Sequence, residues 1–102
     1  MRTPLSHPLN YRVDYGDWAF DYDLSVPGKL SYTGATEAVR HVDETVDVSV
    51  VPVASEVFVV SFTEPSASIV SVQDFGRRVV NTWLTLVADN SLVHMTGELI
   101  PA

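Results

Sequence analysis

Apolar and polar residues alternate with a period of two through most of this chain. Residues 18–25, WAFDYDLS, show the pattern most clearly, because every second residue is aromatic or leucine while the residues between are small or acidic. Successive side chains of a β-strand point to opposite faces of its sheet, so this segment predicts a strand with one buried and one wet face. Helical periodicity is scarce, and the pattern therefore favours an all-β fold.

The alternating segments are separated by short turn sequences such as Gly16-Asp17, Pro27-Gly28 and Asp89-Asn90. About eight strands joined by short loops in chain order predict an antiparallel meander that closes into a small barrel, which removes exposed edges. We expect a single domain over residues 10–102, preceded by a flexible tail at residues 1–9. The expected strands are 11–15, 18–25, 29–33, 45–50, 56–63, 67–73, 77–87 and 92–100, with 34–39 as a connection.

Composition narrows the class of protein. With 102 residues, 46% of them hydrophobic, the chain can form one globular domain with a modest core. Thirteen acidic residues against six basic ones make nucleic acid an unexpected partner, since phosphate binding needs clustered Lys and Arg. The chain has no cysteine, no stretch long enough to span a bilayer and no signal-peptide pattern at its start, so we expect a cytoplasmic protein without a membrane partner.

One carboxylate stands out, at the end of the segment 58–65, FVVSFTEP. In a strand, Phe58, Val60, Phe62 and Glu64 share one face, and the three large apolar residues predict that this face is buried. A carboxylate at the end of a buried stripe is costly unless its charge is paired, hydrogen-bonded or neutralised, and such groups often serve ligand binding or proton transfer. The alternative is that Glu64 turns into water where the strand ends, at Pro65.

The segment 60–65, VSFTEP, resembles the VSWTEP strand of bacterial phenolic acid decarboxylases and the corresponding strand of MoaF-like proteins. The next segment, 69–75, IVSVQDF, is more similar to the MoaF-like group. Both groups have small lipocalin-like (calycin-type) β-barrels, so the resemblance implies that fold here. It also implies a small organic ligand or substrate, aromatic or conjugated, and chemistry without a cofactor.

The resemblance assigns catalytic roles residue by residue. Glu64 matches the decarboxylase glutamate and would move a proton, Arg40 fits the arginine and would hold an oxyanion, and Tyr11 matches the first tyrosine and would donate a hydrogen bond. Val13 stands where the decarboxylases have a second tyrosine, so the pair that grips a substrate carboxylate is incomplete.

Aromatic side chains supply the expected lining of the cavity. Tyr22 and Tyr32 lie in the apolar register of their strands and either line the cavity or fill the core. His41 and His94 lie far apart in sequence, and no third ligand has suitable spacing, so no metal site is expected. The predicted ligand-binding residues are Tyr15, Trp18, Phe20, Tyr22, Tyr32, Phe58, Phe62, Trp83 and His94.

Two classes of function fit these features. The chain could be a cofactor-free enzyme that performs acid–base chemistry of the lyase, isomerase or cyclase type, or a non-catalytic carrier, sensor or accessory subunit with the same cavity. Convergence of Glu64, Arg40 and Tyr11 on one cavity would favour the enzyme. The strand 56–63 also has apolar residues on both faces, at Val57, Val59 and Val60, which is compatible with a homodimer.

Overall fold

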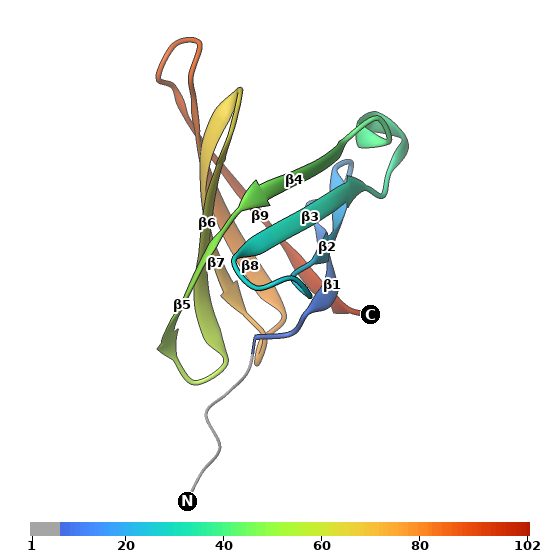
Figure 1. Ribbon diagram of the computed structural model, residues 1–102, viewed down its shortest axis with the longest axis vertical. Coiled ribbons are helices and arrows are strands. Elements are labelled where there is room, and N and C mark those ends of the chain that lie inside the picture. Colours follow the sequence, from blue (N-terminus) through green and yellow to red (C-terminus); the bar gives the residue numbers. More distant parts are fainter. Residues whose placement is uncertain (1–6) are drawn as a thin grey trace, which may run out of the picture.

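The computed structural model describes residues 7–102, and β-strands dominate it, as the alternating pattern predicts (Figure 1). No helix within this described range is long and apolar enough to cross a membrane. The elements are β1 (Asn10–Asp14), β2 (Ala19–Asp23), β3 (Lys29–Gly34), the 3₁₀ turn η1 (Glu37–Val39), β4 (Asp43–Asp47), β5 (Ser49–Ala54), β6 (Val57–Glu64), β7 (Ala67–Asp74), β8 (Val79–Leu86) and β9 (Leu92–Pro101).

The strands form one sheet in the order β4-β3-β2-β1-β9-β8-β7-β6-β5, and every pair is antiparallel. Neighbours in the sheet are neighbours in the chain, except where the first strand meets the last. There β1 pairs with β9 from Tyr11 opposite Pro101 to Asp14 opposite Glu98. The predicted antiparallel meander that curls into a small barrel is confirmed.

The sheet has nine strands rather than about eight because the predicted strand 45–50 is divided at Val48. Before this residue the chain pairs with β3, with Asp47 opposite Lys29, and after it the chain pairs with β6, with Ser49 opposite Ser61. The amide of Val48 donates instead to the carbonyl of Gly28, at 3.0 Å. One bent segment thus forms both edge strands of the sheet, β4 and β5. From this bend, β4 and the neighbouring strand β6 run in different directions (Figure 1).

The turns use positive φ where the chain reverses most tightly. Gly16, with φ of 102°, and Gly28, with φ of 75°, lie in the first two hairpin turns, and both conformations favour glycine. In the turn between β7 and β8, Arg78 takes the positive φ, at 59°, although Gly76 lies two residues earlier.

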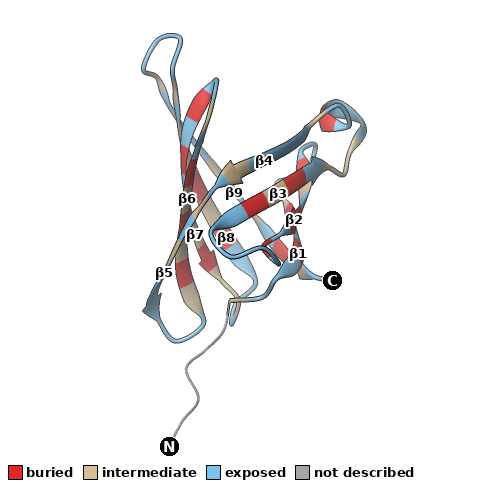
Figure 2. Ribbon diagram, viewed as in Figure 1, coloured by how far each residue is buried: buried red, intermediate tan, exposed pale blue. Residues whose placement is uncertain are grey.

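The core follows the alternation of the strands. Buried residues alternate with partly or fully exposed ones along β6 and β7 (Figure 2), as expected for strands with one face toward the barrel interior. Complete burial of such a side chain stabilises the fold by roughly 1.5–3 kcal/mol relative to leaving it exposed. The largest apolar side chains that are at most 1% exposed are Val13, Leu30, Val60, Val80 and Leu99.

One end of the barrel interior is filled by an aromatic cluster. The His7 ring packs edge-on against Tyr11, Phe58 and Phe75, with centroid distances of 4.9–5.3 Å. The last residues of the predicted tail thus lie against the barrel, and the carbonyl of Leu9 accepts a hydrogen bond from the amide of Leu24. Residues 1–6, over which the tail was also predicted, lie outside the described residues.

Candidate functional site

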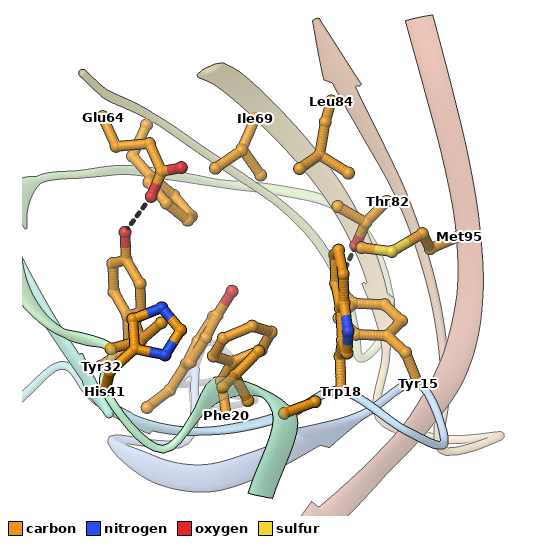
Figure 3. Close-up of a pocket in the computed structure, with 15 residues that line it drawn as sticks. Tyr15, Trp18, Phe20, Tyr32, His41, Glu64, Ile69, Thr82, Leu84 and Met95 are labelled. Atoms are coloured by element: carbon orange, nitrogen blue, oxygen red, sulfur yellow. Dashed lines mark hydrogen bonds between the residues drawn. The ribbon is translucent and has the colours of Figure 1, made fainter. Parts of the chain in front are cut away.

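A cavity of about 290 Å³ lies in the barrel, between residues of β2, β3 and η1 and residues of β6, β7, β8 and β9. Its wall is mostly aromatic and aliphatic, with a few polar groups, which is the usual composition of a small-molecule site. Figure 3 shows these side chains around the empty space. The lining residues are Tyr15, Trp18, Phe20, Tyr22, Tyr32, Ala38, Val39, His41, Val42, Phe62, Glu64, Ile69, Thr82, Leu84 and Met95.

Glu64 lies at the rim of this cavity because it ends the inward-facing stripe of β6. Phe58, Val60 and Phe62 on the same face are buried, and Glu64 is half-buried. One carboxylate oxygen accepts a hydrogen bond from the hydroxyl of Tyr32 at 2.5 Å (Figure 3). The other accepts one from the hydroxyl of Ser66 at 2.8 Å. The carboxylate is therefore held at the cavity by two donors rather than turned into bulk water.

Tyr32 reaches Glu64 from β3, on the opposite wall. Burial raises the pKa of the Tyr32 hydroxyl above its ordinary value, and its hydrogen bond to the Glu64 carboxylate raises the pKa further. Tyr32 accordingly remains protonated in the physiological range and serves as a hydrogen-bond donor to Glu64.

A second polar group lies deeper in the barrel, between Tyr15 and Thr82. The hydroxyl of Thr82 donates to the buried Ser71 at 3.0 Å, and the hydroxyls of Tyr15 and Thr82 are 2.5 Å apart. Because Thr82 has one hydroxyl proton and gives it to Ser71, Tyr15 must be the donor to Thr82. Burial raises the pKa of Tyr15 to about 12, so its hydroxyl also stays protonated.

Tyr22 contributes a hydroxyl of a different kind. Its side chain is only 6% exposed, and its hydroxyl has no hydrogen-bond partner within residues 7–102. No fully enclosed side-chain nitrogen or oxygen in that range lacks a partner, so this hydroxyl is reachable from the cavity that Tyr22 lines. Burial raises the pKa of Tyr22 well above its ordinary value and keeps the group neutral.

The structure brings many of the predicted site residues together. Two roles were predicted as alternatives for Tyr22 and Tyr32, lining the cavity or filling the core. Each residue does both, because it is buried and also borders the cavity. The predicted residues that line the cavity are Glu64, Tyr15, Trp18, Phe20, Tyr22, Tyr32 and Phe62.

Arg40 and Tyr11 lie elsewhere, so the expected convergence with Glu64 does not occur. Arg40 follows η1, is exposed, and pairs with Glu37 at 3.1 Å. Tyr11 is 3% exposed and donates to the side-chain oxygen of Gln73 at 2.6 Å. The ring of Tyr22, which lines the cavity, packs against that of Tyr11 at 5.4 Å.

Phe58, Trp83 and His94 were also expected at the cavity and do not line it. Phe58 belongs to the aromatic cluster around His7. Trp83 and His94 stack on each other at 4.7 Å as cross-strand neighbours of β8 and β9. Their positions alternate with those of Thr82 and Met95, which face inward, so both belong to the outer face of the sheet.

Several lining residues were not predicted. Thr82 could have been found from its alternation with the buried Val80 in the strand 77–87. Met95 could have been found in the same way from Leu99. His41, considered only as a metal ligand, reaches the cavity through the segment around η1, whose position no strand pattern indicates. Across the described part of the chain, no three His, Asp or Glu side chains cluster in a way that could hold a metal ion.

Comparison with known proteins gives one family and one similar fold. The sequence model described as MoaF-like matches residues 9–100, which is nearly the whole chain. A crystal structure of a putative beta-lactamase from Burkholderia vietnamiensis is similar, with a TM-score of 0.80, 19% sequence identity and 100% of both chains covered. At that identity the likeness concerns the fold alone. No curated protein matched the sequence.

Proposed function

The chain belongs to the MoaF-like family, and from this premise we propose that it binds a small organic molecule in the barrel cavity and exchanges a proton with it through Glu64. The molecule is mostly apolar and carries an aromatic or conjugated group. The reaction would be of the lyase, isomerase or cyclase type and would need no cofactor.

One observation carries this proposal: an apolar, aromatic cavity has a hydrogen-bonded carboxylate at its rim and an unpartnered tyrosine hydroxyl inside it. Glu64 accepts from Tyr32 and Ser66, while the hydroxyl of Tyr22 has no partner among the described residues. The Tyr22 hydroxyl is not enclosed by protein, and its residue lines the cavity. A hydroxyl whose donor and acceptor capacity is free at an apolar cavity fits a protein whose ligand supplies a hydrogen bond there.

The geometry suits acid–base chemistry. Glu64 can take a proton from, or return one to, a ligand atom within hydrogen-bond distance. Tyr32 fixes the carboxylate in one orientation, which lowers the entropic cost of reaching a productive arrangement. The rings of Trp18, Phe20 and Phe62 offer flat apolar surface for a conjugated ligand.

A second candidate function is a carrier or sensor that binds the same class of molecule without changing it. The position of Arg40 favours it, because the only ion pair of that guanidinium within residues 7–102 is with Glu37, away from Glu64. Without a cation at the cavity, an anionic intermediate would lack its strongest stabilising partner.

The test begins with the protein purified from its producing cell and analysed by native mass spectrometry. We expect a retained small molecule, which then serves as ligand in assays of wild-type protein, Glu64→Gln and the control Glu37→Gln. If the protein is an enzyme, Glu64→Gln should bind within a few-fold of wild type yet lose about 100-fold or more of turnover, whereas Glu37→Gln should behave as wild type. Unchanged turnover in Glu64→Gln would exclude Glu64 as the proton carrier.

Binding without conversion by wild type would instead favour the carrier or sensor. The same native spectrum also counts the chains in each particle, which tests the predicted homodimer.

A further inference from the structure

We propose that the ligand carries a hydrogen-bond-donating cation, such as a protonated amine, that binds at Glu64, and that the cavity discriminates against carboxylates of the same shape. This inference rests on the proposed function and specifies the chemical class of the ligand.

The first observation is the direction of the hydrogen bonds in the cavity wall. Tyr32 gives its proton to Glu64, and Tyr15 gives its proton to Thr82, which gives its own to Ser71. These three hydroxyl protons are therefore already used within the protein. What these residues and Glu64 still offer to a ligand are oxygen lone pairs.

The second observation is the charge of the wall. Glu64 is the one carboxylate among the lining residues, and the lining contains neither Lys nor Arg within the described chain. Arg40 pairs with Glu37 outside the cavity. Lys29 of β3 pairs with Asp47 of β4, and both side chains are exposed. His41 also lines the cavity, but it is exposed to solvent. An anionic ligand would thus meet a carboxylate with no Lys or Arg beside it.

The third observation is the shape and chemistry of the remaining surface. The aromatic faces of Trp18, Phe20 and Tyr32 carry negative electrostatic potential, which attracts cations as well as packing against flat apolar groups. The hydroxyl of Tyr22, which has no partner among the described residues and is not enclosed by them, can either donate or accept. The indole N–H of Trp18 is a donor, but that residue is 46% exposed at the cavity edge. The interior therefore favours a ligand that brings protons and positive charge.

The test uses three probes that share one ring system and differ in a single group: 2-(1-naphthyl)ethylamine, 2-(1-naphthyl)ethanol and 1-naphthaleneacetate. Each is titrated into ¹⁵N-labelled full-length protein, and affinities are taken from the amide shifts of residues that line the cavity. We expect the amine to bind at least about tenfold more tightly than the alcohol, because only the ammonium sets a positive charge against the Glu64 carboxylate in a partly dehydrated cavity. The acetate should bind most weakly, because it brings a like charge to Glu64.

Two variants separate a contact with Glu64 from a general effect of charge. Glu64→Gln should weaken the amine at least about tenfold and leave the alcohol within about threefold of wild type. Glu44→Gln is the matched control, because Glu44 is opposite Tyr32 in β4, is exposed and does not line the cavity. It removes the same charge and should leave all three affinities within about threefold.

The outcomes distinguish the two proposals. If the probes shift cavity amides but the acetate or the alcohol binds as tightly as the amine, the proposed ligand class is wrong. The proposal of a small-molecule site would still stand. An equal effect of Glu44→Gln and Glu64→Gln on the amine would also overturn the ligand class. No cavity shifts with any probe would contradict the binding function itself, and the ligand class with it.

Discussion

At the scale of single residues, Gln73 organises the polar interior of the barrel. It is fully buried, its side-chain oxygen accepts from Tyr11 at 2.6 Å, and its side-chain nitrogen donates to Ser71 at 3.1 Å. Since Ser71 also accepts from Thr82, this network runs from the cavity to the aromatic cluster at His7. Tyr11 is thereby held in a structural role, with its hydroxyl proton used by Gln73.

His7 completes the network and makes it sensitive to pH. Its Nδ1 lies 2.7 Å from the carbonyl oxygen of Pro8, which can only accept, so the neutral ring carries its proton on Nδ1. Burial lowers the pKa of His7 below its ordinary value of 6.5, and this outweighs the oxygens of Pro8 and Gln73, which accept hydrogen bonds from the protonated ring and raise the pKa. The folded protein therefore favours the neutral ring more than the unfolded chain does.

We predict that His7 makes the protein less stable as the pH falls below about 6.5. Between the lowered pKa of the folded state and the ordinary pKa of the unfolded state, the unfolded chain binds more protons, so the free energy of unfolding decreases with falling pH. His7→Phe keeps an aromatic ring and should reduce this loss, measured by urea unfolding at pH 7.5, 6.5 and 5.5. The control His94→Phe removes an exposed imidazole instead. Equal losses in wild type and His7→Phe would contradict the prediction.

At the scale of secondary-structure elements, the position of η1 depends on Gly34, the last residue of β3. A Cβ built on Gly34 would lie 1.7 Å from the carbonyl oxygen of Val39, so the backbone of η1 rests directly on this glycine. Val39 and the neighbouring Ala38 and His41 line the cavity. A close approach of two backbones thus sets one wall of the proposed binding site.

We expect Gly34→Ala to displace η1, to lower the free energy of unfolding by about 1–3 kcal/mol as overpacking does, and to weaken ligand binding. Gly76→Ala is the matched control, because its Cβ would meet only side-chain atoms, the end of the flexible Glu56 side chain at 2.7 Å and a carboxylate oxygen of Asp74 at 3.4 Å. Urea unfolding and the naphthyl-probe titrations measure both effects. If Gly34→Ala and Gly76→Ala behaved alike, the contact between β3 and η1 would not determine the position of this cavity wall.

The elements also show what the sequence could predict. Period-two alternation located most strands, because a half-buried strand needs that pattern wherever it lies. It did not separate β4 from β5, because the alternation continues through Val48, where the chain bends. It did not place Arg40 or His41, since both follow a connection whose path depends on the fit of η1 against Gly34. His94 was misplaced because Leu92 and Val93 are both apolar, so the start of this strand does not reveal which face points inward. Leu99, 1% exposed, decides the register.

At the scale of the whole molecule, the barrel depends on contacts between the two ends of the chain. β1 pairs with β9, so the last strand to be made closes against the first. Leu99 lies at this seam, opposite Val13 in β1, and both side chains are completely buried. Pairings so distant in sequence form only when the intervening meander is in place, which ties the seam to the stability of the entire fold.

We therefore expect Leu99→Ala to lower the free energy of unfolding by about 2–5 kcal/mol, the range for a leucine truncated in a packed core. Leu92→Ala is the same substitution at the other end of β9, where the side chain is 66% exposed, and it should cost less than about 1 kcal/mol. Urea unfolding followed by tryptophan fluorescence and by far-UV circular dichroism should give coincident transitions in both variants, since closure makes the barrel one cooperative unit. Separate transitions in Leu99→Ala, or equal losses in the two variants, would show that the sheet is stable without its β1–β9 seam.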